Sequence, residues 1–287
     1  MLRKALIAGL STVAAAALSA APANAASYTY PDTHYVEADE LVSNLNSIAW
    51  PSQETYNTYS NSTPLLTWGT NGTPTSYRNR SRCASFVTEV FKHTFSWATP
   101  SYFQTSFGST SPFAADYYNT IKTASVSDHF ARIGSVSILR RGDIIAIKYN
   151  DGGSGGSGEA TGHVMIVQDK HQYDRDGDPD TTEWAVRVVD STSNPHGAAE
   201  TAQPGSPYLS YPDTRSVPVF GSAGDDEEYN GAGRGWIFIQ VVNNRATGYW
   251  WGANENTFYS VANRPMAMGR VVESTSSQTD QVMELNQ

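Results

Sequence analysis

The sequence predicts an α+β protein in which helices come first and a largely antiparallel sheet follows. Two observations carry this prediction. Apolar residues recur at helical spacing in the first half of the chain, whereas the second half contains short apolar runs rich in Val, Ile and Trp, separated by turn residues. No internal repeat with a period of about 20–50 residues is visible, so the pattern does not favour a repeat architecture.

Three helices are expected. Segment 36–50 and segment 111–124 both carry apolar residues at helical spacing. The helix between them begins near Cys83, where the polar stretch "RSR" gives way to apolar residues that include Phe86 and Val90.

The strands are expected after these helices, since the period of the apolar residues changes there. The turn "LRRGD" announces the first strand, and the flexible, glycine-rich loop "NDGGSGGSGEATG" separates the first two. The expected strands are residues 143–149, 162–170, 183–192 and 235–242, with 268–272 closing the sheet.

The N-terminus has the features of a secretory signal peptide. Arg3 and Lys4 precede the apolar stretch 5–20, and a small-residue cleavage site ends at Ala25. A membrane anchor is the alternative, although this stretch is short for a bilayer span and rich in Ala, Ser and Thr. We therefore expect export of the chain and removal of residues 1–25.

The rest of the chain divides by composition. Residues 26–80 are expected to form an N-terminal extension that holds the helix 36–50, and its turn-rich, aromatic remainder from residue 51 is expected to lie in order over the surface. Residues 81–272 are expected to form the main domain and residues 273–287 a flexible tail. Cleavage after Ala25 removes two basic residues and no acidic one, so the formal charge changes from −9 to −11. This charge argues against nucleic acid and anionic membranes as partners of the mature protein.

Cys83 is the single cysteine of the chain, and an odd cysteine in an exported protein indicates a reactive thiol or pairing between chains. The thiolate is the nucleophilic form, and a helix N-terminus lowers the pKa of a cysteine. Neighbouring Arg80 and Arg82 add positive potential. The alternative is a buried cysteine that serves as a small hydrophobic residue.

A cysteine nucleophile needs a base, and the base needs a residue that orients it. His163 begins an apolar strand after the glycine loop, and Asp190 ends the next strand. If the two strands are antiparallel neighbours, the start of one lies beside the end of the other. The alternatives are a histidine that only caps its strand and an aspartate that only opens a turn. His196, in "STSNPHG", is a further candidate at this rim.

The ordered motifs "RCASFV", "LRRGDIIAI" and "GHVMIV", with a polar residue ending the next strand, resemble the NlpC/P60 cysteine peptidases. That family belongs to the same papain-like group as the CHAP amidases. The resemblance covers roughly residues 66–272. It implies a papain-like fold, in which a cysteine at a helix start packs on an antiparallel sheet. It also implies Cys83 as nucleophile, His163 as base and Asp190 as orienting residue.

Several positions depart from the family pattern. Arg82 stands where the family has Asp, and Ala84-Ser85 stands where it has Ser-Gly. Leu66 occupies the place of a tyrosine that is thought to assist the family's site, so Tyr77 is our candidate for that role. These departures affect the expected substrate more than the reaction type.

The segment "DRDGDPDTTE" clusters Asp174, Asp176, Asp178 and Asp180 at alternating positions. Such carboxylates suit Ca²⁺, but Pro179 and the residue at the twelfth loop position do not fit an EF-hand. A solvated acidic loop is the alternative. A zinc site at Cys83, His163 and Asp190 is less favoured, because paired-cysteine and HExxH spacings are absent from the sequence.

Together these features favour a secreted, periplasmic or wall-associated bacterial cysteine hydrolase. The resemblance implies that it cleaves amide bonds in peptidoglycan peptides, with no cofactor required and structural Ca²⁺ as an option. Two alternatives stay open. One is an amidase or acyltransferase on another secreted substrate, and the other is a non-catalytic wall-binding module with the same fold.

Overall fold

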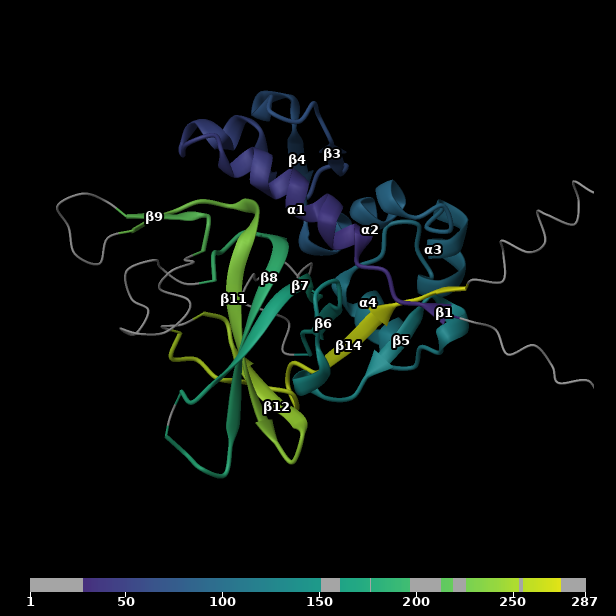
Figure 1. The fold of residues 1–287 in the computed structure, drawn as a ribbon, viewed down its shortest axis with the longest axis vertical. Helices are drawn as coiled ribbons and strands as arrows, with labels where there is room; N and C mark the ends of the chain where they lie inside the picture. Colours follow the sequence, from purple (N-terminus) through teal and green to yellow (C-terminus); the bar gives the residue numbers. More distant parts are fainter. Residues whose placement is uncertain are drawn as a thin grey trace, which may run out of the picture. The chain divides into compact units, whose positions relative to one another are not determined.

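An eight-stranded sheet in which every neighbouring pair is antiparallel forms the centre of the computed structural model (Figure 1). The structure describes residues 28–150, 161–175, 177–196, 213–218, 226–252 and 255–274. The strand order across the sheet is β13 (Tyr259–Ser260), β12 (Arg245–Trp250), β11 (Gly231–Val242), β8 (Thr182–Thr192), β7 (Gly162–Tyr173), β6 (Ile144–Lys148), β14 (Met266–Val271) and β5 (Phe130–Ile133).

Four α-helices accompany the sheet in the described part of the chain, together with short 3₁₀ turns. They are α1 (Thr33–Asn46), α2 (Cys83–Thr94), α3 (Pro100–Phe107) and α4 (Ala114–Ile121). Figure 1 shows the long strands β7, β8 and β11 extending beyond these helices. The predicted α+β class, with helices first and an antiparallel sheet after them, is therefore confirmed.

Smaller strand pairs complete the fold. In the three-stranded sheet, β4 (Arg78–Ser81) lies between β2 (Asn57–Tyr59) and β3 (Leu65–Thr67), and β2 runs parallel to β4. β1 (Tyr28–Thr29) pairs with β15 (Glu273–Ser274), and β9 (Ser216–Pro218) pairs with β10 (Asp226–Glu228). Because β4 leads directly into α2, the small sheet supports the start of that helix.

The central strands are buried on both faces, which explains their continuous apolar runs. In β6, Ile144 and Ala146 belong to the hydrophobic cluster that includes the helices, whereas Ile145 and Ile147 belong to a second cluster. Side chains alternate between the faces of a strand, so one strand serves both clusters. The sheet therefore has one face against the helices and another against a separate apolar layer.

The expected N-terminal extension, residues 26–80, contributes to the main core. Ala38, Leu41 and Leu45 of α1 are fully buried in the same cluster as α2 and the central strands. Tyr28–Ser274 forms one compact unit, so the expected boundary at residue 80 does not separate compact units. The expected signal peptide, residues 1–25, and most of the expected tail lie outside the described residues.

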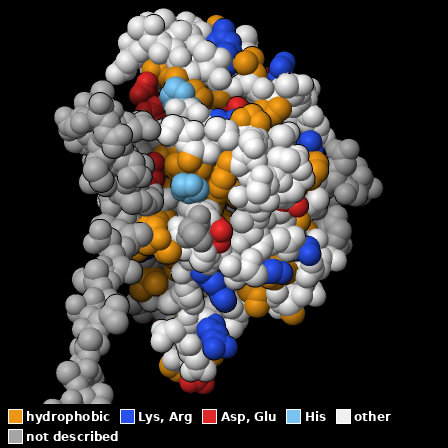
Figure 2. Space-filling model, turned by 90° about the vertical axis from the view of Figure 1, so that its right-hand side faces the viewer, with side chains coloured by type: hydrophobic (Ala, Val, Ile, Leu, Met, Phe, Trp, Pro, Cys, Tyr) orange, Lys and Arg blue, Asp and Glu red, His pale blue; other side chains and the backbone are white. Residues whose placement is uncertain are grey.

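None of the helices in the described part of the chain combines the length and apolar composition needed to cross a bilayer. On the face shown in Figure 2, Lys and Arg side chains are interspersed with uncharged and hydrophobic ones.

Candidate active site

The site begins where α2 begins. Arg82 has extended backbone angles and precedes the first helical residue, Cys83. The Ser85 hydroxyl accepts a hydrogen bond from the Arg82 backbone N–H at 2.9 Å, which satisfies a donor at the helix start. Ser85 is one of the departures from the family pattern, and it stabilises the turn that presents Cys83.

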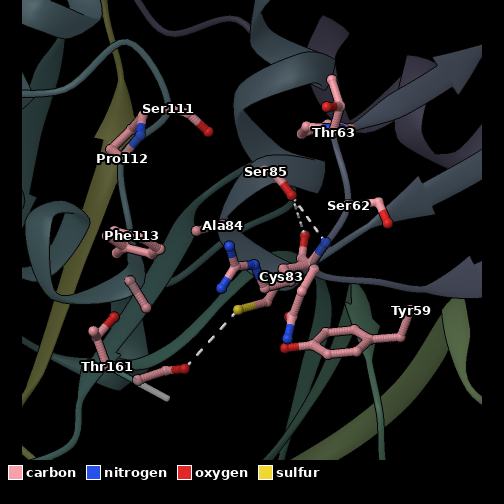
Figure 3. A pocket seen from close by; sticks show the side chains of 15 residues that line it. Tyr59, Ser62, Thr63, Cys83, Ala84, Ser85, Ser111, Pro112, Phe113 and Thr161 are labelled. Carbon is pink, nitrogen blue, oxygen red and sulfur yellow. Dashed lines mark hydrogen bonds between the residues drawn. The ribbon is translucent and has the colours of Figure 1, made fainter. Parts of the chain in front are cut away.

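Cys83 lies in a pocket of about 300 Å³. Figure 3 shows its sulfur between two walls, one formed by Ser111, Pro112 and Phe113 and the other by Tyr59 and Ser62. The cysteine is 6% exposed, so it is largely enclosed although it reaches the pocket. This position lets a small group approach the sulfur.

Gly162, the first residue of β7, forms the floor beside the thiol. Cys83 Sγ lies 3.9 Å from the Gly162 carbonyl oxygen. Gly162 has a φ of +147°, and a Cβ at this position would lie 1.9 Å from the Ile147 carbonyl oxygen. Only glycine fits at this position between β6 and β7. This close fit brings the next residue, His163, against Cys83.

Cys83 and His163 form a buried acid–base pair. Burial raises the pKa of the Cys83 thiol, but the charge of His163 and hydrogen bonds from His163, Val164 and Ala84 outweigh it and lower that pKa. Burial lowers the pKa of His163, but the Cys83 charge and Asp190 raise it to about 9. These opposite shifts favour a thiolate–imidazolium pair.

Asp190 joins the pair from β8. Its Oδ2 atom accepts a hydrogen bond from His163 Nε2 at 2.6 Å, so Nδ1 is the His163 nitrogen left to face the thiol. Burial raises the pKa of Asp190, but the charges of Arg215 and His196 and hydrogen bonds from both histidines hold it well below its usual value. The carboxylate is therefore ionised and can orient His163.

His196 is the second histidine on this carboxylate. Its Nε2 lies 2.9 Å from Asp190 Oδ2, and its Nδ1 lies 3.0 Å from the Trp251 carbonyl oxygen. The Trp251 ring stacks on His196 with centroids 4.1 Å apart and meets His163 edge-on at 4.8 Å. Trp251 thus covers the imidazoles and keeps their hydrogen bonds away from water.

Arg215 holds the other oxygen of Asp190. Its guanidinium donates to Asp190 Oδ1 at 2.8 Å and to both oxygens of Asp213 at 2.9 Å. Such a buried cation is tolerated because two carboxylates and the Gly231 carbonyl accept its hydrogen bonds. The structure thus surrounds Asp190 with three cationic or protonated partners.

Two glycines of β11 make room for this network. Gly233 pairs with Asp190 across the sheet, and a Cβ at Gly233 would lie 2.7 Å from Arg215 Nε. A Cβ at Gly235 would likewise lie 2.7 Å from the His196 Cβ. The alternating glycines of "GAGRG" are a sequence signal for this close packing that the sequence analysis missed.

Some of the residues predicted from the sequence meet at this site, and others lie elsewhere. Cys83, His163 and Asp190 come together, and the expected adjacency of the start of β7 and the end of β8 is confirmed. His196 also joins them, but it is 3% exposed and lies behind Asp190 rather than on an open rim.

Tyr77 is not brought to the pocket. Its hydroxyl donates to Glu40 Oε1 at 2.6 Å, and the residue is fully buried in the main hydrophobic cluster. The pocket tyrosine is Tyr59, which pairs with Ser81 across the parallel strands β2 and β4. Parallel pairing of two short, polar strands leaves no apolar signal, so the sequence did not point to Tyr59.

The acidic segment shows local turns. Asp174 Oδ1 accepts from the Gly177 N–H at 2.7 Å, and Asp178 Oδ1 accepts from the Asp180 N–H at 2.9 Å. Asp174, Asp178 and Asp180 are exposed and form no metal-binding group among the described residues, and Asp176 lies outside them. Calcium binding by this loop stays a prediction.

A metal-like donor set does occur at the centre of the site. Ligand atoms of His163, Asp190 and His196 lie within 4.8 Å of one another. Each of these atoms is already engaged in the hydrogen bonds described above, and Arg215 adds a positive charge. A metal ion would have to displace these bonds, so the arrangement fits a hydrogen-bonded network better than a metal centre.

Comparison with known proteins adds one relative. "Uncharacterized protein R653" of Acanthamoeba polyphaga mimivirus is 28% identical over 214 residues, which cover 71% of this chain and 83% of the viral protein. No protein-family model and no solved structure matches the chain. The name of this viral protein states no activity.

Proposed function

We propose that this protein is an exported cysteine hydrolase that cleaves amide bonds, with peptides of the bacterial cell wall as substrates. The observation that carries the proposal is the buried row in which Cys83 faces His163 and His163 donates to Asp190. A thiol with a lowered pKa beside an oriented imidazole is the arrangement that nucleophilic catalysis needs. The resemblance to papain-like NlpC/P60 peptidases supports the same reaction.

In the proposed reaction, the Cys83 thiolate attacks the carbonyl carbon of the substrate amide, and the C–N bond breaks with formation of a thioester. His163 donates its Nδ1 proton to the leaving amine. It then takes a proton from water, whose oxygen attacks the thioester and releases the acid and Cys83. Asp190 keeps the His163 ring in the tautomer that places Nδ1 toward the sulfur.

The tetrahedral intermediate requires donors for its oxyanion. The backbone N–H of Cys83 at the start of α2 is one candidate, and the Tyr59 hydroxyl on the opposite wall is the second. Burial, and then the charge of Cys83, raise the pKa of Tyr59, so its hydroxyl keeps its proton as a donor.

The pocket supports a polar substrate. Among the described residues that line it, Arg82 brings a positive charge, none brings a carboxylate, and hydroxyl groups come from Ser62, Thr63 and Ser111. The Arg82 guanidinium lies over the Phe113 ring, 5.3 Å from its centroid. These features favour a substrate whose acyl part is polar and neutral or anionic.

The test is mass spectrometry of purified muropeptides incubated with protein that begins at Ala26. The proposal expects products that correspond to hydrolysis of one amide bond, and none with Cys83→Ala. Intact muropeptides, together with turnover of another secreted amide, would favour an amidase or acyltransferase on a different substrate. Binding of muropeptides without turnover, and with an unreactive thiol, would favour the non-catalytic wall-binding module.

A further inference from the structure

The protonation state of His196 follows from its two hydrogen-bond partners. Nδ1 faces the Trp251 carbonyl oxygen at 3.0 Å, and Nε2 faces Asp190 Oδ2 at 2.9 Å. Both partners are acceptors when Asp190 is ionised, so both nitrogens must carry hydrogen. The charge of Arg215, which donates to Asp190 Oδ1 at 2.8 Å, keeps the pKa of Asp190 low and the carboxylate ionised. This geometry assigns a hydrogen-bond donor to each nitrogen of the buried ring.

The charges around His196 balance this assignment. Asp190 and Asp213 contribute two carboxylates, and Asp213 Oδ2 also accepts from the His196 backbone N–H at 2.8 Å. Arg215 bonds both carboxylates and supplies one positive charge. A charged His196 supplies the second, and the neighbouring rings are His163, with centroids 6.1 Å apart, and Trp251.

We propose that His196 is a second positioning histidine, which shares the Asp190 carboxylate with His163 and thereby sets the upper pH limit of the thiolate–imidazolium pair. The Oδ2 atom of Asp190 accepts from both rings, at 2.6 and 2.9 Å. The positive charge on one ring weakens the hold of Asp190 on a proton of the other. His163 therefore releases its proton more readily than it would if it were the single histidine bonded to Asp190.

This inference rests on the proposed cysteine hydrolase, but its test measures the thiol itself. The probe is iodoacetamide, and the rate of Cys83 alkylation is followed against pH in protein that begins at Ala26. For the wild type, the rate profile is expected to have an upper inflection near the pKa of His163, about 9. His196→Gln removes the charge, but its amide can still donate to Asp190. The upper inflection is expected to rise by about one pH unit.

His171→Gln is the matched control. His171 is an exposed histidine on the same strand as His163 and pairs with Asp169 at 3.3 Å. Its replacement should leave the inflection unchanged. A purely structural role for His196 predicts a lower melting temperature of His196→Gln with the inflection at its wild-type position, and that result would overturn the proposal.

A second measurement needs no variant at the site. Nitrogen NMR of the ¹⁵N-histidine-labelled wild type should show both ring nitrogens of His196 protonated at the pH of highest thiol reactivity. One unprotonated nitrogen would overturn the proposal even if His196→Gln fails to fold.

The two proposals fail in different ways. A shifted inflection without muropeptide hydrolysis would support the role of His196 and contradict the proposed hydrolase. Hydrolysis of muropeptides with an unshifted inflection would support the hydrolase and contradict the proposed role of His196.

Discussion

Cys83 and His163 form the part of the site where burial and charge oppose each other. Burial alone would keep the thiol and the imidazole neutral, but each group stabilises the charge of the other, and Asp190 supports the imidazolium. Sequence order identified these three residues, because a helix start, a strand start and a strand end are visible in local patterns. It did not identify Arg215, which no pattern connects with Asp190.

Substitutions of Cys83, His163 and Asp190 should show that these three residues act as a unit. Cys83→Ala is expected to abolish hydrolysis and His163→Ala to lower kcat by about 10³-fold or more, while the double variant is little worse than Cys83→Ala. Asp190→Asn should lose less, because it keeps the shape but not the charge. Steady-state kinetics on muropeptides measure these losses, and His171→Ala is the control. Wild-type hydrolysis by Cys83→Ala would refute the catalytic assignment.

The pKa shifts set the pH range of thiol reactivity. The thiolate forms above the lowered pKa of Cys83, and the imidazolium persists below about pH 9. Wild-type Cys83 should therefore react with iodoacetamide well below pH 8, with a plateau that ends near pH 9. His163→Ala should move the onset of reactivity to higher pH, because the thiolate loses its cation. A wild-type thiol that reacts only above pH 9 would contradict the ion pair.

Strands β7 and β8 position the site through their ends. Both were predicted from apolar runs, and their boundaries agree closely with residues 162–170 and 183–192, although β7 continues to Tyr173. Helix α3 was missed despite clear local signals: Thr99 accepts from the Tyr102 N–H, Pro100 follows, and Gly108 ends the helix in a left-handed conformation.

The glycine at the start of β7 can be tested against a matched glycine. Gly162→Ala should lower stability by at least about 1–3 kcal/mol and slow Cys83 alkylation, because its Cβ would collide with the Ile147 carbonyl oxygen. Gly72→Ala also has a positive φ, but has nothing within 4 Å of the new Cβ. Thermal melts and alkylation rates of the two variants separate backbone strain from collision. Equal, small effects of the two substitutions would argue against a close contact between residue 162 and the Ile147 carbonyl oxygen.

The acidic segment between β7 and β8 offers a test by metal removal. If its carboxylates bind Ca²⁺, a chelator should lower the melting temperature of the protein and added Ca²⁺ should restore it. Calcium at 100 times its dissociation constant stabilises the folded state by about 2.7 kcal/mol when it does not bind the unfolded chain. Asp178→Asn should abolish the response. A melting temperature that does not respond to the chelator would favour the alternative, a solvated acidic loop without a metal.

At the scale of the whole molecule, the described chain behaves as one unit in which the N-terminal segment is part of the core. Residues of α1 pack with α2. The Trp68 indole N–H also donates to the Glu37 carbonyl at 3.0 Å. The turn-rich, aromatic composition of residues 51–80 predicted a surface extension, whereas Tyr77 is fully buried in the main hydrophobic cluster and Trp68 packs against that cluster. Composition alone does not reveal where such apolar side chains pack.

Export is the prediction that concerns the whole chain. Arg3 and Lys4, the apolar stretch after them and the small residues before Ala26 predict a mature protein that begins near Ala26. N-terminal sequencing of the secreted fraction measures this start directly. Cytosolic protein, obtained without the first 25 residues, is the control for correct folding. Secreted protein with an intact Met1 would show that the segment is not cleaved.

The sequence by itself determined the features that depend on local periodicity. It predicted the helix that starts near Cys83, the apolar strands that carry His163 and Asp190, and the α+β class, because apolar spacing follows from the geometry of helices and strands. The antiparallel neighbourhood of two successive strands then followed from their order.

Only the tertiary structure decided what surrounds Asp190. Arg215 and Trp251 had no sequence signal, and His196, a sequence candidate for the rim, lies behind Asp190 instead. These side chains meet because Gly233 and Gly235 leave space on β11 and because buried charges require partners. Tyr59 reaches the pocket through the parallel pairing of β2 with β4. Such contacts between remote residues depend on packing and electrostatics in three dimensions, which have no period along the chain.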